Sequence, residues 1–118
     1  METLSLFKNS TDYQSFSAGE TIFEAGSPAT SMYVVQEGEV DIIVNGRVVE
    51  TAGPGNLFGE MALIDKKSRS ATVKARTDCR VVPVDQKRFT FLIQQTPFFA
   101  LHVMRVMATR IRNMDSLL

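Results

Sequence analysis

Cysteine and histidine are almost absent from this chain, which carries one of each, Cys79 and His102. A single cysteine cannot form a disulfide within the chain and fits a reducing cytoplasm. A single histidine leaves no imidazole cluster for a metal site, and no serine–histidine–aspartate set without His102. The acidic residues form no obvious catalytic pair either. We therefore expect neither catalysis nor a bound metal ion, with Cys79 half-buried in a strand and His102 packed on a helix.

An excess of charge and a long hydrophobic run are also missing. The 118 residues carry 13 basic and 13 acidic side chains, which gives no electrostatic footprint for nucleic acid or an anionic membrane. No apolar run approaches the roughly 20 residues that span a bilayer, and the first residues do not open a signal peptide. With 44% hydrophobic residues, the chain can bury one core. We expect one cytoplasmic domain over residues 1–118, without a nucleic-acid or membrane partner.

The chain does contain many short runs of β-branched and aromatic residues, separated by turns with glycine or proline. Asn45-Gly46 between two such runs is typical of a type I′ hairpin. About eight strands at this close spacing predict a mainly β jelly-roll barrel over residues 16–84. Residues 1–15 form a helical or irregular lead. Its one apolar helical turn, expected to dock on the barrel, holds Leu4, Leu6 and Phe7.

Residues 85–118 change to a helical pattern, so two C-terminal helices are expected to flank the barrel. Asp85 can cap the first of them, which extends to about residue 95. Thr96 and Pro97 then end that helix and favour the start of another. The apolar face of the first helix is expected to hold Phe89, Leu92 and Ile93.

The last helix carries apolar residues at alternating spacings of four and three, which form a heptad seam. The members of this seam are Ala100, Met104, Met107, Ile111, Met114 and Leu118. A helix packed on its own barrel gives such a pattern, and so does a seam between two copies of the chain or a lid over a ligand. These interpretations do not exclude one another, and a homodimer through this helix is one expectation.

Residues 57–73 are the stretch that suggests a chemistry. Gly59 lets another group approach the backbone closely, and the helix formers after it can begin a short helical turn. The first amides of such a turn attract an anion. Arg69, beyond a polar loop, can swing back and offer a planar fork of donors to a phosphate. Glu60 suits a second group on the ligand, such as a sugar hydroxyl. The stretch therefore predicts a sugar-phosphate ligand.

Two segments of this stretch resemble a known family. Residues 58–63 read Phe-Gly-Glu-Met-Ala-Leu, and residues 69–73 read Arg-Ser-Ala-Thr-Val. Together they resemble the phosphate-binding cassette of cyclic nucleotide-binding domains, as in the catabolite activator protein and protein kinase A regulatory subunits. The resemblance extends from about residue 16 to residue 112 and implies cyclic AMP or cyclic GMP as ligand, with no further cofactor. The site residues that it implies are Phe58, Gly59, Glu60, Met61, Ala62, Arg69, Ser70, Ala71, Arg110 and Met114.

The resemblance also implies roles for these residues. Arg69 would hold the cyclic phosphate, and Glu60 would accept a hydrogen bond from the ribose 2′-hydroxyl. Ser70 could serve the phosphate or a guanine, and we expect cyclic AMP as the preferred ligand. The family often has a proline where this chain has Ser68, which loosens the loop. Met114 stands where a relative recognises adenine through a hydroxyl, so the base is poorly specified.

Three functional interpretations follow. The first is a non-enzymatic cyclic nucleotide sensor that passes its signal through the C-terminal helix to a partner in trans, since the sequence continues into no effector domain. The second is a protein–protein interaction module that kept the fold without the ligand. The third, a catalytic barrel, has no residues to support it. Intact Glu60 and Arg69 favour the first over the second, because buried charges are costly without a ligand.

Overall fold

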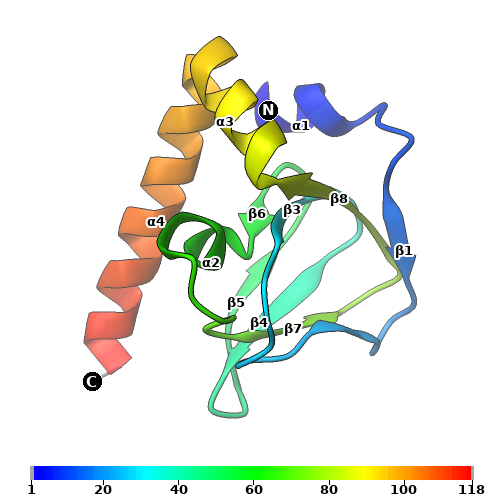
Figure 1. The fold of residues 1–118 in the computed structure, drawn as a ribbon. Helices are drawn as coiled ribbons and strands as arrows, with labels where there is room; N and C mark the ends of the chain where they lie inside the picture. Colours follow the sequence, from blue (N-terminus) through cyan, green and yellow to red (C-terminus); the bar gives the residue numbers. More distant parts are fainter. Residues whose placement is uncertain (1, 118) are drawn as a thin grey trace.

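The computed structural model describes the backbone of residues 2–117 and the side chains of residues 3–113. Within that part, a short helix is followed by the strands, and the two longest helices come last (Figure 1). In chain order the elements are α1 (Glu2–Phe7), β1 (Gln14–Phe16), β2 (Thr21–Phe23), β3 (Ser31–Glu37), β4 (Val40–Val44), β5 (Arg47–Ala52), β6 (Leu57–Phe58), α2 (Glu60–Asp65), β7 (Thr72–Ala75), β8 (Cys79–Asp85), α3 (Gln86–Gln95) and α4 (Pro97–Leu117).

The strands form two four-stranded antiparallel sheets, ordered β1-β8-β3-β6 and β2-β7-β4-β5. Each sheet joins strands that are far apart in sequence, since β3 pairs with β8 and β4 pairs with β7. The helices lie together beside the strands, and α4 runs along one flank of the molecule (Figure 1). The predicted mainly β jelly roll with flanking helices is confirmed.

The first sheet is a middle layer, because its central strands are buried on both faces. Val35 of β3 and Val81 of β8 belong to one cluster with residues of the second sheet, such as Val73. Val34 and Val82, their neighbours in sequence, belong to another cluster with residues of the helices. Successive side chains of a strand point to opposite faces. Two buried faces therefore explain why the middle of each strand, residues 32–35 of β3 and 81–84 of β8, is a continuous apolar run.

Three phenylalanine rings, one each from α1, α3 and α4, pack together on the outer face of this sheet. Phe99 of α4 is fully buried and lies 6.2 Å from the ring of Phe7 in α1 and 6.3 Å from that of Phe89 in α3. The side-chain amide of Gln36 donates to the carbonyl oxygens of Phe7 and Ser10, at 2.8 and 3.0 Å. The lead of the chain is therefore docked on the barrel, as the apolar turn at its start predicts.

His102 connects α1 to α4, with its Nδ1 2.7 Å from Oγ1 of Thr3. Burial lowers the pKa of His102 below its ordinary 6.5, and the charges of Arg110 and Arg105 act in the same direction. The imidazole is therefore neutral at pH 7 and packs within the helical layer, as predicted. None of the described helices is both long and apolar enough to cross a membrane.

The structure contains the predicted hairpin turn, the predicted cap of α3 and the predicted start of α4. Asn45 and Gly46 have φ of 52° and 75°, the positive pair that a type I′ turn requires. Oδ1 of Asp85 accepts a hydrogen bond from the backbone amide of Arg88 at 2.8 Å, so Asp85 caps α3. Pro97 is the first residue of α4. Cys79 begins β8 and is 5% exposed, which is more buried than expected.

Strand β1 was missed by the sequence prediction. It begins at Gln14, inside the segment taken as a helical or irregular lead, and pairs with β8. Gln-Ser-Phe is short and carries two polar residues, so no alternation marks it as a strand. The barrel therefore begins slightly before residue 16.

The predicted apolar faces of both C-terminal helices were partly wrong. Ile93 is 38% exposed, and the seam residues Met104 and Ile111 are 56% and 45% exposed. Among described seam residues, Met107 packs against the core. Between residues 97 and 113 of α4, the buried residues are Phe99 and Val103. Phe99 inserts between α1 and α3, and this contact sets how α4 is rotated about its own axis. The heptad spacing does not determine which face of α4 is buried. The side chain of Met114 and the whole of Leu118 lie outside the described residues.

The packing of α3 and α4 predicts that substitution of Phe99 in α4 and of Phe91 in α3 will lower the free energy of unfolding by different amounts. Phe99→Ala removes a fully buried ring and should lower the free energy of unfolding by about 3–5 kcal/mol. Phe91→Ala removes a ring that is 61% exposed and should change it by less than about 0.5 kcal/mol. Urea unfolding followed by circular dichroism measures both. Equal costs would mean that α3 and α4 do not pack as described.

Candidate functional site

A cavity of about 90 Å³ lies between the second sheet, α2 and α4. Every predicted site residue whose side chain the structure describes lines it, and Met114 lies beyond the described side chains. The full lining is Phe23, Ile42, Val44, Val49, Glu50, Phe58, Gly59, Glu60, Met61, Ala62, Arg69, Ser70, Ala71, Val73, Arg110 and Asn113. Most of the wall is apolar, and the charged groups are two carboxylates and two guanidinium groups.

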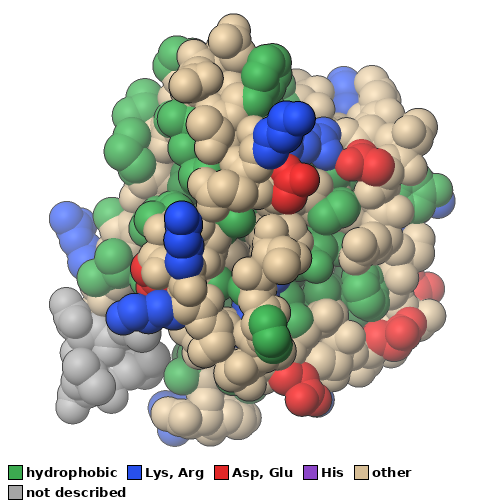
Figure 2. All heavy atoms as spheres, in the orientation of Figure 1, with side chains coloured by type: hydrophobic (Ala, Val, Ile, Leu, Met, Phe, Trp, Pro, Cys, Tyr) green, Lys and Arg blue, Asp and Glu red, His purple; other side chains and the backbone are tan. Residues whose placement is uncertain are grey.

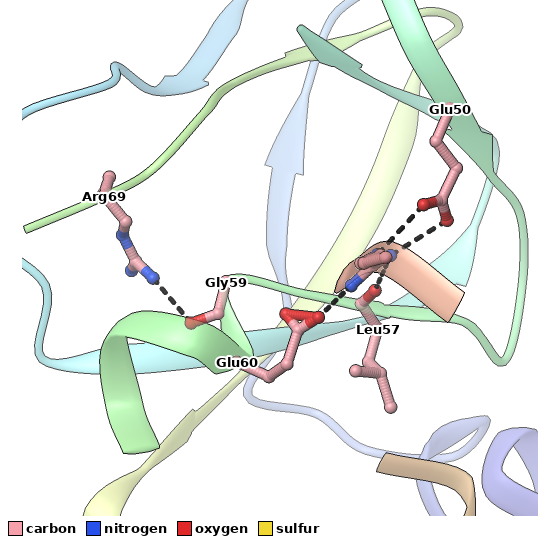
Figure 3. Close-up of polar contacts among 6 residues, drawn as sticks. Glu50, Leu57, Gly59, Glu60 and Arg69 are labelled. Carbon is pink, nitrogen blue, oxygen red and sulfur yellow. Dashed lines mark hydrogen bonds and ion pairs between the residues drawn. The ribbon is translucent and has the colours of Figure 1, made fainter. Parts of the chain in front are cut away.

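Gly59 joins β6 to α2 and lets Arg69 come close. Its φ is +80°, in the left-handed region, and a Cβ built at this position would lie 2.6 Å from Nη1 of Arg69. Nη1 instead donates a hydrogen bond to the carbonyl oxygen of Gly59 at 3.0 Å (Figure 3). The sequence prediction that Arg69 swings back over the start of this helix is confirmed.

Arg69 is a buried cation that forms no ion pair with any residue whose side chain the structure describes. It is 6% exposed, and its Nη2 donates to the carbonyl oxygen of Ser31 at 2.6 Å. Its guanidinium lies 4.0 Å from the centre of the Phe23 ring. Nε is the one buried side-chain polar atom among the described residues that has no hydrogen-bond partner. Burial lowers the pKa of Arg69, although Tyr33 and Glu60 act in the opposite direction.

The carboxylate of Glu60 is paired with Arg110 from the opposite side of the cavity. Glu60 is 2% exposed, and Nη1 of Arg110 donates to its Oε1. Arg110 also donates from Nε and Nη2 to the two carboxylate oxygens of Glu50, at 2.9 Å each. Nη2 additionally reaches the carbonyl oxygen of Leu57 at 2.6 Å (Figure 3). One arginine of α4 therefore connects β5, β6 and α2, through Glu50, Leu57 and Glu60.

The two carboxylates keep Arg110 charged inside the protein. Burial by itself lowers the pKa of Arg110, but hydrogen bonds with Glu50 and the charge of Glu60 outweigh it and raise the pKa. Removal of one partner of such a buried pair typically costs about 3–5 kcal/mol, because the other charge stays buried alone. The pairing therefore holds the middle of α4 against the barrel.

Sequence reasoning identified Arg110 only by resemblance and missed Glu50. Glu50 lies on β5 and pairs in register with Ile42 of β4. The residues before and after it, Val49 and Thr51, carry no motif that marks a ligand site. Only the pairing of β5 with β4 and the position of α4 bring its carboxylate to the cavity, so no sequence signal could have found it.

Comparison with known proteins identifies a family for the part of the chain that includes Gly59, Glu60 and Arg69. The family model of the cyclic nucleotide-binding domain matches residues 13–96, which include Glu50, Gly59, Glu60 and Arg69. This chain belongs to the cyclic nucleotide-binding domain family. The match ends before Arg110, so the contribution of α4 to the cavity rests on the structure.

Solved structures of this family are similar along most of the chain. The PKAR CBD2 structure with bound Sp-2Cl-cAMPS is 28% identical over 89% of this chain and 70% of its own, with a TM-score of 0.78. The catabolite activator protein of Thermus thermophilus is 28% identical over 97% of this chain and 56% of its own, with a TM-score of 0.79. The chain thus spans little more than half of that relative.

A third similar structure comes from a cyclic-GMP-dependent signalling pathway that regulates bacterial phytopathogenesis. It is 30% identical over 86% of this chain and 84% of its own, with a TM-score of 0.71. The similar structures therefore include one that is named for a cyclic AMP analogue and one that is named for cyclic GMP.

Proposed function

We propose that this cyclic nucleotide-binding domain is a non-enzymatic sensor module that binds cyclic AMP or cyclic GMP in the cavity between α2 and α4. The observation that carries the proposal is Arg69, a 94% buried guanidinium with an unpaired Nε and no ion pair among the described residues. A buried cation of this kind is stabilised by an anion. The cyclic phosphate of a nucleotide supplies one.

The other groups in the cavity suit the sugar and the base. A carboxylate accepts about four hydrogen bonds, so Glu60 can keep Arg110 and also accept from a ribose 2′-hydroxyl. Gly59 and Ala62 present backbone close to the phosphate, with Phe58, Met61 and Ala71 as apolar lining. Ser70 stands beside Arg69 and serves the phosphate or the base. Met114, whose side chain lies outside the described residues, is proposed to pack on the base.

An interaction module that kept the fold without the ligand is the alternative. Such a module would gain nothing from Arg69, whose buried Nε has no hydrogen-bond partner among the described residues. An unsatisfied buried group costs about 1–3 kcal/mol, and more when it is charged. The presence of Arg69 at this position supports a ligand.

Helix α4 is proposed to carry the signal. The cavity of about 90 Å³ is far smaller than the roughly 300–1,000 Å³ typical of ligand pockets. Because Arg110 of α4 lies across it, a nucleotide that reaches Glu50 and Glu60 displaces this side chain, and α4 is proposed to move with it. A ligand shifts such an equilibrium to the extent that it contacts one position of the helix better than the other. Entry of the nucleotide and the position of α4 are therefore coupled.

The outer side of α4 offers a surface to a cytoplasmic partner in trans. Leu101, Met104 and Ile111 are 45–56% exposed there, and hydrophobic side chains are visible along this flank (Figure 2). A second copy of the chain or an effector protein would cover them. Light scattering that finds a monomer at all concentrations would leave the effector as the partner.

The first prediction of this proposal concerns Arg69. Arg69→Ala should weaken cyclic nucleotide binding by about 2–5 kcal/mol, because the phosphate loses its charged partner. Arg76→Ala is the matched control, since Arg76 is exposed, pairs with Asp41 at the surface and does not line the cavity. Calorimetric titration of each variant measures the affinities. Parent-like affinity in Arg69→Ala would contradict the proposal.

A second prediction concerns α4. Bound nucleotide should increase the protection of backbone amides from about residue 105 onward against hydrogen exchange, because the helix closes on the base. Exchange measured with and without saturating ligand tests this directly. Unchanged protection in α4, beside clear protection at residues 59–63, would mean that the ligand binds and no lid moves.

A further inference from the structure

The charged groups of the cavity follow one another in a definite order. Figure 3 shows Arg69 and Glu50 on opposite sides of Glu60, with Gly59 next to Arg69. The phosphate, ribose and base of a cyclic nucleotide are joined in a similar order, with the ribose in the middle. With the phosphate at Arg69 and the ribose at Glu60, the base is directed toward Glu50. This placement rests on the proposed function.

The carboxylate of Glu50 already accepts hydrogen bonds from a planar donor group, the guanidinium of Arg110. Its two carboxylate oxygens accept from Nε and Nη2 of Arg110, at 2.9 Å each. This is the two-point arrangement in which a carboxylate binds a fork of parallel N–H groups. The side chain is 32% exposed and lines the cavity, so it is open to a ligand on one side.

Guanine and adenine differ in how many hydrogen bonds they can donate to the carboxylate of Glu50. Guanine presents N1–H and its 2-amino group side by side, two donors for two carboxylate oxygens. Adenine presents its 6-amino donor next to N1, whose lone pair faces the second oxygen. A carboxylate is acceptor-only when ionised, so it satisfies the guanine edge at two points and the adenine edge at one.

We propose that Glu50 is the residue that selects the base, and that it selects guanine. The N1–H and 2-amino group of guanine take the place of Nε and Nη2 of Arg110 on the carboxylate. Both oxygens of Glu50 stay paired in this exchange. With adenine in the same place, one oxygen loses its donor and faces a lone pair, which a half-buried carboxylate tolerates poorly.

Arg110 leaves Glu50 when guanine binds there, and it keeps the carboxylate of Glu60 as its partner. In the structure its Nη1 donates to Oε1 of Glu60, and this pair does not involve Glu50. The guanidinium therefore stays neutralised while the base is read. This proposal reverses the expectation of cyclic AMP, which took account of Ser70 but not of Glu50.

The test is the ratio of the dissociation constants of cyclic AMP and cyclic GMP, measured by calorimetry on the whole chain. The parent should favour cyclic GMP by about tenfold to a hundredfold, the range for one two-point contact with a base. Glu50→Gln offers one acceptor and one donor, which suits adenine, so the preference should vanish or invert. Glu39→Gln, an exposed carboxamide outside the cavity, should leave the ratio unchanged.

A ligand-side measurement removes any dependence on the folding of the variant. Cyclic IMP has N1–H and lacks the 2-amino group, so the parent should bind it more weakly than cyclic GMP. If Glu50 acted only by holding Arg110 in place, Glu50→Gln would weaken the binding of cyclic AMP and cyclic GMP equally. The ratio of their dissociation constants would then stay constant. A constant ratio in Glu50→Gln, or equal binding of cyclic IMP and cyclic GMP, overturns the proposal for Glu50 while binding itself stands. Binding of neither cyclic nucleotide overturns the proposed function as well.

Discussion

The pairing of Glu60 with Arg110 is the interaction on which the arrangement of this site depends. Glu60 is 2% exposed at the start of α2, and a carboxylate buried so deeply needs a positive partner. That partner comes from α4, the last element of the chain. The need to neutralise Glu60 therefore fixes where α4 crosses the barrel, and the burial of Phe99 sets the rotation of α4 that brings Arg110 to the cavity.

Arg69 forms no ion pair within the described part of the chain. Its guanidinium donates to the carbonyl oxygens of Gly59 and Ser31, and its Nε has no hydrogen-bond partner there. One carboxylate that already has a cationic partner and one cation that has no ion pair among the described residues make an asymmetric pair. A ligand with one negative group and a hydroxyl at a fixed distance from it complements both. A cyclic nucleotide has these features, which is why the two residues together support a ligand more strongly than either does alone.

The part of the site that lies close together in sequence could be predicted, and the part assembled by tertiary contacts could not. Gly59, Glu60 and Arg69 lie on one turn and the segment after it, so their spacing alone indicates the chemistry. Glu50 reaches the cavity only through the pairing of β5 with β4. The exposure of Met104 has the same origin, because contacts of Phe99 outweigh the heptad spacing in the rotation of α4.

The proposed role of the Glu60 carboxylate is to accept a hydrogen bond from the ribose 2′-hydroxyl, and a 2′-deoxy cyclic nucleotide tests this role directly. Calorimetry should show that the parent binds the 2′-deoxy ligand more weakly than the matching ribonucleotide by about 1.5–3 kcal/mol, the contribution of a hydrogen bond to a charged group. Glu60→Gln should reduce the difference between the two ligands. Equal affinity of the parent for both would place the sugar elsewhere and contradict the role assigned to Glu60.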